Sequence, residues 1–322
     1  GSATLEDNGT IESSAGSLTF NGSVALDNAS LLLTGGSVAL NSGATISGGE
    51  LQLFDSSLTL GANVGMTNDS TLGLRNTTIN PGSYTIGMTG GTLGLGGTYS
   101  DFGAVQTDNA TSLELNANTS ITRSAPLEIG GLDLNAFALT LGSATTDLAI
   151  HSTLAVDNSD SQLITNAADL ILTHPLQLSA GGITSTGGIL TLSQGGTVEG
   201  TGELDVSGTT LKLSDNLSAG GGTLTSNNTS VLHLLDDVTI TFYSVQTVFK
   251  SLEHNGKTLT LGSAVSDLKL LDPLTLNAVT LHTQGADLNL QGALTLQNNS
   301  LIDSTGGTLT LGGTVDNSSE LT

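Results

Sequence analysis

Residues 267–278 read DLKLLDPLTLNA, and residues 287–298 read DLNLQGALTLQN. The second copy begins 20 residues after the first (287 minus 267) and keeps four of its five leucines at the same positions, with Gln291 in place of Leu271. In both copies apolar residues flank a polar one, which is the period-2 pattern of a short strand with one buried face. A period of about 20 residues that holds such strands predicts one coil of a parallel β-helix, in which each coil stacks on the next.

The same pattern recurs along the chain. The triplet Leu-Thr-Leu occurs seven times, and the stretch LTLGSA at residues 139–144 returns unchanged at residues 259–264. Gly, Asn, Asp and Ser fill the gaps between triplets, as turns require. No segment has the period of a long amphipathic helix. We therefore expect an all-β chain that forms a single-stranded parallel β-helix, with about 20–22 residues and three short strands per coil.

Composition narrows the range of partners. The chain has 322 residues and a net charge of −23, with only six Lys and Arg. Nucleic acids and anionic membrane surfaces are bound through basic patches, so we expect neither as a partner. The absence of cysteine excludes disulfides and Cys-ligated metal centres. Aromatic residues make up 3% of the chain, fewer than a globular core of this size normally uses. We expect no cofactor and no metal site.

The domain organisation follows from the repeats. We interpret Gly1-Ser2 as a remnant of expression cloning, and we expect residues 3–322 to form one continuous β-helix. No run of about 18 apolar residues occurs, so we expect no membrane insertion by this chain. The sequence stops within the repeat pattern, which indicates a piece of a larger exported protein.

Two regions, residues 97–107 and residues 238–257, depart from the repeat and hold several of the few aromatic residues. Two interpretations are open. They are loops that leave the coils and carry specific function, or they are local changes of strand length in which aromatic side chains fill a wider core. On the first interpretation, the candidate ligand contacts are Tyr99, Phe102, Phe242, Tyr243, Phe249, Lys250 and His254.

Blocks of the form T-G-G-x-L-x-L support a family resemblance. They occur as TGGSVAL at 34–40, TGGTLGL at 89–95, TGGILTL at 186–192 and TGGTLTL at 305–311. With the strands between them, these blocks resemble the passenger repeats of autotransporters and the haemagglutinin-type exoproteins of two-partner secretion in Gram-negative bacteria. The resemblance implies a right-handed β-helix exported to the bacterial cell surface. Its implied roles are adhesion, self-association, biofilm formation, or holding a toxin away from the cell.

The sequence contains few candidates for catalytic or metal-binding sites. β-Helix lyases and hydrolases of polysaccharides need clustered carboxylates, and the acids here are scattered. We therefore expect no enzyme. Asp267 and Asp287 should lie one coil apart, where a hydrated turn or a bridging cation would accommodate both charges. His233 and His254 are 21 residues apart (254 minus 233) and should also be neighbours, but a zinc site would need further ligands.

The expected function is therefore a non-catalytic adhesin or stalk at the cell surface, and its partner is a second copy of the chain, a host receptor or a carbohydrate. The alternative is a carbohydrate- or receptor-binding module that uses exposed aromatic residues. A polysaccharide lyase or hydrolase has the least support.

Overall fold

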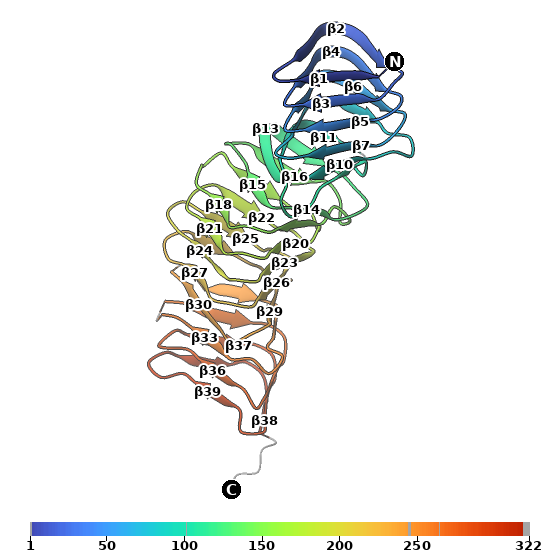
Figure 1. Ribbon diagram of the computed structural model, residues 1–322. Coiled ribbons are helices and arrows are strands. Elements are labelled where there is room, and N and C mark those ends of the chain that lie inside the picture. Colours follow the sequence, from blue (N-terminus) through green and yellow to red (C-terminus); the bar gives the residue numbers. More distant parts are fainter. Residues whose placement is uncertain (1, 101, 244–245, 264, 318–322) are drawn as a thin grey trace. The chain divides into compact units, whose positions relative to one another are not determined.

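The computed structural model of the protein describes residues 2–100, 102–243, 246–263 and 265–317. These residues form parallel strands stacked in about 15 coils, which confirms the predicted all-β solenoid (Figure 1). The chain divides into two compact units, Gly1–His151 and Ser152–Thr322. In the described part of the chain, no helix has the length and apolar character needed to span a membrane.

The strands of the first unit form three parallel columns, in which each strand pairs with a strand of the next coil. One column contains β1 (Ala3–Glu6), β3 (Val24–Asp27), β5 (Ala44–Ser47), β7 (Val64–Thr67), β10 (Ile86–Thr89) and β12 (Val105–Gln106). The second contains β2 (Thr10–Phe20), β4 (Ser30–Leu40), β6 (Glu50–Leu60), β8 (Thr71–Arg75), β9 (Thr78–Asn80), β11 (Thr92–Tyr99), β13 (Ser112–Ile121), β15 (Gly131–Asp133) and β16 (Ala138–Leu141). The third contains β14 (Leu127–Ile129) and β17 (Leu148–Ile150).

The second unit contains five groups of paired parallel strands. The first is β18 (Leu154–Val156), β21 (Leu176–Leu178), β24 (Gly196–Val198), β27 (Leu217–Ala219), β30 (Val238–Phe242), β33 (Leu259–Leu261), β36 (Thr280–His282) and β39 (Leu301–Asp303). The second is β19 (Gln162–Ile164), β22 (Gly182–Thr184), β25 (Glu203–Asp205) and β28 (Thr223–Thr225). The third is β20 (Leu170–Leu172), β23 (Ile189–Leu192), β26 (Thr210–Leu213), β29 (Val231–Leu234) and β32 (Ser251–Glu253).

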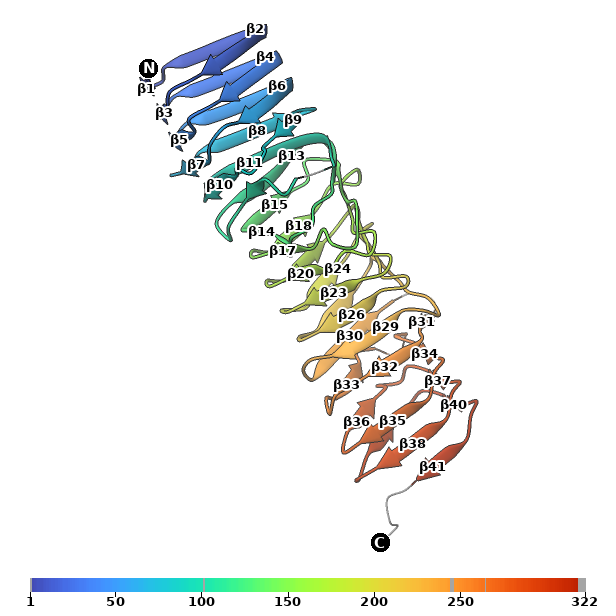
Figure 2. The same cartoon turned by 90° about the vertical axis from the view of Figure 1, so that its right-hand side faces the viewer.

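The last two groups lie in the C-terminal coils, where Figure 2 shows their strands stacked in order. One contains β31 (Thr247–Phe249), β34 (Leu268–Leu270), β37 (Leu288–Leu290) and β40 (Leu309–Leu311). The other contains β35 (Leu274–Asn277), β38 (Leu294–Gln297) and β41 (Val315–Asn317).

The long strands β2, β4 and β6 differ from the three short strands predicted for each coil. Each of them bends midway, at a backbone of positive φ: 66° at Ala15, 94° at Gly36 and 50° at Asp55. Each long strand thus covers two faces of its coil. Glycine is required at position 36, because a Cβ there would collide with the carbonyl oxygen of Gly16 in the coil before.

The pairing register confirms the predicted period. Paired residues are mostly 20 or 21 positions apart, and Ser30, for example, pairs with Glu50. The interval widens to 23 between Leu217 and Ile240 (240 minus 217). A parallel ladder tolerates these differences, because the extra residues are accommodated in the turns between strands.

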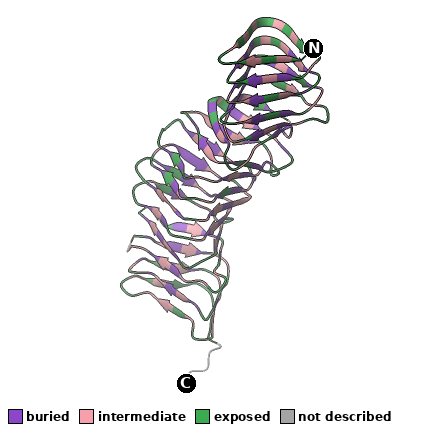
Figure 3. Cartoon of the chain, viewed as in Figure 1, coloured by how far each residue is buried: buried purple, intermediate pink, exposed green. Residues whose placement is uncertain are grey.

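The core consists of columns of inward-facing apolar side chains, and Figure 3 colours the ribbon purple where residues are buried. One column of the second unit contains Leu170, Leu190, Leu211, Leu232 and Leu252, all buried and each paired with the next. Each leucine covers its neighbours above and below, so the column excludes water along its length. In the last described coil no further coil covers the core, and Leu311, which pairs with the buried Leu290, is 41% exposed.

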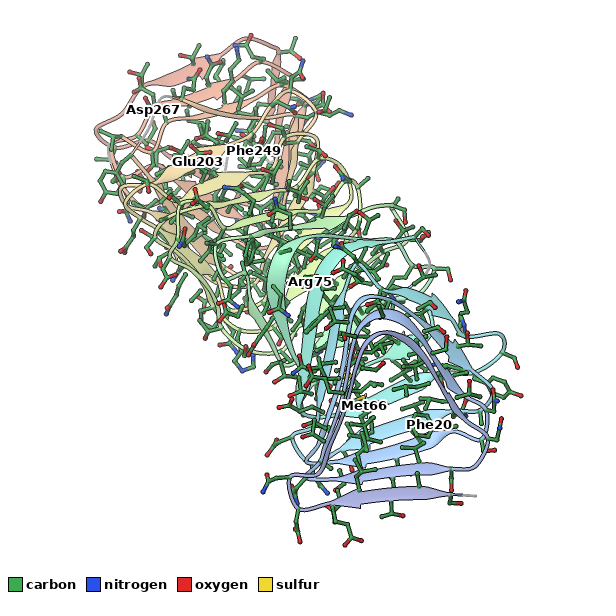
Figure 4. The ribbon with its side chains drawn as sticks, turned by 90° about the horizontal axis from the view of Figure 1, so that it is seen from above. Phe20, Met66, Arg75, Glu203, Phe249 and Asp267 are labelled. Atoms are coloured by element: carbon green, nitrogen blue, oxygen red, sulfur yellow. The ribbon has the colours of Figure 1, made fainter. Side chains whose placement is uncertain are left out.

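The two sequence copies that predicted the fold lie on adjacent coils, because Leu268 pairs with Leu288. The carboxylates that precede these leucines accept backbone hydrogen bonds. The N–H of Asp287 donates to Oδ1 of Asp267 at 2.8 Å, and the N–H of Thr308 donates to Oδ1 of Asp287 at 2.7 Å. Asp267 is labelled in Figure 4. These carboxylates therefore tie each coil to the next through the backbone of the following coil.

The two regions expected to depart from the repeat follow the coils in their described residues. The segment 238–257 supplies β30, β31 and β32, each paired with strands of other coils. The segment 97–107 supplies the end of β11 and the whole of β12. Residue 101 and residues 244–245 lie outside the described residues.

Candidate ligand-binding groove

Four of the five aromatic residues expected to contact a ligand are buried. Tyr99 is 5% exposed, Phe102 and Phe249 are 0% exposed, and Phe242 is 1% exposed. The expectation of exposed aromatic platforms is wrong at these four positions. The physical reason is the strand period: Phe242 follows the buried Ile240 by two residues and therefore lies on the same inward side.

Tyr99 and Phe102 form a small aromatic cluster in the core of the first unit. Their ring centroids are 5.2 Å apart, and the rings are tilted by 58°. The Tyr99 hydroxyl lies 2.8 Å from the carbonyl oxygen of Leu74 and 3.1 Å from that of Gly96. Burial raises the pKa of the Tyr99 phenol above its ordinary value, and the hydrogen bond to Gly96 offsets only part of this effect. The pair therefore stabilises the fold and is closed to a ligand.

The other three candidates, Tyr243, Lys250 and His254, reach the surface. Tyr243 is 57% exposed. The exposed Lys250 ammonium lies 3.9 Å from a carboxylate oxygen of Asp272. The half-buried His254 lies 2.8 Å from the carbonyl oxygen of Thr275. Of the seven residues singled out from the sequence, these three are available for contact with a ligand.

A row of outward-facing side chains crosses five successive coils of the second unit. It runs over β18, β21, β24, β27 and β30, which lie one above another in Figure 1. The row consists of Ala155, Gln177, Thr197, Ser218 and Thr241, each paired with the next. Four of these five side chains are small, so the surface is low along the row. We call this row and its borders the polar groove.

Two adjoining hollows form the polar groove. The larger has a volume of about 460 Å³ and the smaller one about 370 Å³. Gln177 and Thr197 line both hollows, so the two are continuous across these residues. The remaining polar side chains of the lining are Asp157, Ser179, Gln194, Glu199, Asp215, Asn216, Ser218, Thr239 and Thr241.

The polar side chains of the row have no hydrogen-bond partner among the described residues; they are Gln177, Thr197, Ser218 and Thr241. Some ladders elsewhere on the surface are internally bonded. Asn41 donates to Asn21 at 2.7 Å, and Ser37 donates to Ser17 at 3.0 Å. The polar groove therefore offers free amide and hydroxyl groups, whereas those ladders do not.

The border of the polar groove is negative. Asp157, Glu199 and Asp215 line the hollows, and no Lys, Arg or His is among the lining residues. Asp215 accepts the N–H of Asn216 at 2.7 Å, and the Asn216 side chain in turn accepts the N–H of Thr239 at 2.6 Å. These hydrogen bonds hold the wall of the polar groove in place.

We expected His233 and His254 to be neighbours, and the structure gives each of them a different hydrogen-bond partner. His233 pairs with Glu253 in the β29–β32 register, and its Nδ1 lies 2.7 Å from Oε2 of that residue. His254 follows Glu253 and bonds to Thr275 on a later coil. Among the residues that the structure describes, no group of three or more His, Asp or Glu side chains is placed to hold a metal ion.

The polar groove was not predicted from the sequence, although one signal was present. Along β21, β24, β27 and β30, the residue between two inward positions is Gln, Thr, Ser or Thr. The same residue types occupy outward positions throughout the chain, so this signal does not single out one row. No protein-family model, no curated protein and no solved structure matches the chain.

Proposed function

We propose that this protein is a non-catalytic attachment module that holds a neutral, linear carbohydrate in the polar groove. The observation that carries the proposal is the row of unpartnered amide and hydroxyl groups on successive coils. The resemblance of the T-G-G blocks to exported β-helices supports a place at the bacterial cell surface, as part of a larger adhesin or stalk. The partner is then a host or environmental glycan.

Carbohydrate fits the polar groove for chemical reasons. Sugar hydroxyls both donate and accept hydrogen bonds, as do the side chains of Gln177, Thr197 and Ser218. Coils repeat at about 4.8 Å, so a polymer lying along the row meets the same kind of polar group again and again. Tyr243 follows the outward Thr241 by two residues at the end of β30, and its exposed ring offers an apolar face beside Gly220.

The charge of the polar groove favours a neutral ligand. Asp157, Glu199 and Asp215 would repel the carboxylates or sulfates of an acidic polysaccharide, and no cation in the lining would offset this repulsion. We therefore expect neutral glucans, mannans or galactans to bind and uronate polymers to bind more weakly.

Two other functions have less support. A lyase or hydrolase would bring two carboxylates to one scissile bond, and Asp215 is already engaged in holding its turn. Side-by-side association of two copies would use polar ladders such as Asn21–Asn41, whose groups are bonded to each other. Concentration-dependent sedimentation of the unliganded chain would favour association, and new reducing ends in a polysaccharide digest would favour catalysis.

A bulky charged substitution in the floor of the polar groove tests the proposal. In Thr197→Arg the long side chain would occupy the space shared by the two hollows. We expect the affinity for a neutral linear polysaccharide, measured by titration calorimetry, to fall by at least about tenfold, or about 1.4 kcal/mol.

Thr191→Arg is the matched control. Thr191 lies on β23 of the same coil and faces outward between the buried Leu190 and Leu192. It receives the same new side chain outside the polar groove and should bind like the wild type. Equal loss in both variants, or no binding of any neutral polysaccharide by the wild type, would overturn the proposal.

A further inference from the structure

The turn after β32 holds an Asn-Gly dipeptide, Asn255-Gly256, next to two histidines. Both residues are exposed and have positive φ, 50° at Asn255 and 77° at Gly256. In Asn-Gly sequences the backbone nitrogen of glycine can attack the asparagine side chain, because no side chain on glycine hinders the approach. The rate of this reaction depends on which groups accept and supply protons at the turn.

One histidine contacts the attacking nitrogen. The N–H of Gly256 donates to Nδ1 of His254 at 3.0 Å. The other ring nitrogen, Nε2, lies 2.8 Å from the carbonyl oxygen of Thr275 and must donate to it. This bond fixes the proton on Nε2, so Nδ1 carries a free lone pair. A base is therefore in place within hydrogen-bond reach of the proton that must leave.

The second histidine contacts the leaving group. Nδ2 of Asn255 donates to Nε2 of His233 at 2.8 Å and to the carbonyl oxygen of Leu234 at 3.1 Å. Nδ1 of His233 lies 2.7 Å from the Glu253 carboxylate. An amide NH2 group can only donate, so Nε2 of His233 is the acceptor and Nδ1–H donates to Glu253, which orients the ring. His233 and the carbonyl of Leu234 therefore hold the Asn255 amide in one orientation.

We propose that Asn255 is a site of self-catalysed deamidation in the folded protein, with His254 as base and His233 as a positioning residue that orients the Asn255 amide. The Gly256 nitrogen bonds to Cγ of Asn255 and gives its proton to His254. The Cγ–Nδ2 bond breaks, and Nδ2 takes the proton held by His254 and leaves as ammonia. Water then opens the resulting succinimide at either carbonyl and yields aspartate or isoaspartate. No oxidant or reductant is needed.

The product changes the contacts between coils. The Asn255 amide links its coil to the preceding one through His233 and the carbonyl of Leu234. Replacing the amide by a carboxylate removes both donated hydrogen bonds and adds a negative charge near Glu253. Deamidation would therefore loosen this turn as the protein ages.

The chain contains two further Asn-Gly dipeptides, which serve as internal references: Asn8-Gly9 and Asn21-Gly22. The N–H of Gly9 donates to the carbonyl oxygen of Glu6, which cannot act as a base at neutral pH. The side-chain oxygen of Asn21 accepts a hydrogen bond from Asn41. Neither contact supplies a base to the glycine N–H.

The test is peptide mapping by mass spectrometry after incubation of the full chain at neutral pH, with isoaspartate labelled by a specific methyltransferase. We expect deamidation at Asn255 to be faster in the native protein than in urea, and faster than at Asn8 or Asn21 in the same molecules. In His254→Ser, the serine hydroxyl can still accept a hydrogen bond from the N–H of Gly256, but the base is removed. This substitution should slow the reaction at Asn255 roughly a hundredfold.

His233→Ala removes the acceptor that orients the Asn255 amide, and it should slow the reaction less than His254→Ser does. The ratio of native to urea rates guards against a variant that fails to fold, since an unfolded variant would give a ratio near one. A slower reaction at Asn255 in the native wild type than in urea would overturn the proposal. So would an unchanged rate in folded His254→Ser.

Discussion

The phenol of Tyr99 makes a testable contribution to stability. Its hydroxyl is buried and is shared between the carbonyl oxygens of Leu74 and Gly96. Tyr99→Phe would remove these hydrogen bonds, while the Gly96 carbonyl keeps the N–H of Asn76, so we expect a loss of about 1 kcal/mol in the free energy of unfolding. Denaturant titration would measure this loss. Tyr84→Phe, at a residue that is 38% exposed, is the control and should change stability little.

The buried phenol of Tyr99 also predicts that the protein becomes less stable at alkaline pH. Burial raises the pKa of the Tyr99 phenol in the folded state above the value near 10 of an unfolded chain. The folded state then holds its proton where the unfolded state has lost it, so stability falls as the pH rises above about 10. Tyr99→Phe should lack this part of the pH dependence. An identical alkaline slope in wild type and variant would contradict the assignment.

The strands are tied together at their beginnings as well as along their ladders. Asp287 accepts the N–H of Thr308, just before the paired strands β37 and β40. We expect Asp287→Ala to lower the free energy of unfolding by about 1 kcal/mol, because one hydrogen bond between coils is lost. Asp287→Asn keeps an oxygen acceptor and should be milder, as measured by thermal unfolding. Equal effects of the two substitutions would show that charge matters here, not the hydrogen bond.

The alternation of apolar and polar residues predicts the strands, but it does not predict the polar groove. Alternation of apolar and polar residues gave the parallel coils and their period of about 20 residues. Applied within β30, it assigns Phe242 to the core with Val238 and Ile240, and it leaves Tyr243 outside. The polar groove could not be found in this way. Its depth depends on small outward side chains such as Ser218. These side chains lie on different strands and become neighbours only through the pairing register.

The polar groove belongs to the second unit, because every lining residue lies between positions 155 and 241. Ladders bonded between coils occur in both units, for example Ser17–Ser37 and Asn277–Asn298. A stacked solenoid gains stability from contacts between neighbouring coils, so a stretch of several coils can retain both its structure and its surface.

This arrangement predicts that the second unit alone binds the carbohydrate. Residues 152–322, produced without residues 1–151, should bind a neutral linear polysaccharide within about twofold of the full chain, a difference of about 0.4 kcal/mol. The polar groove and its supporting columns belong to this unit. Titration calorimetry would measure the affinity, circular dichroism would verify the β-structure, and Thr197→Arg in the fragment should abolish binding. Binding by residues 1–151 instead would move the site to the first unit, because no residue of the polar groove lies there.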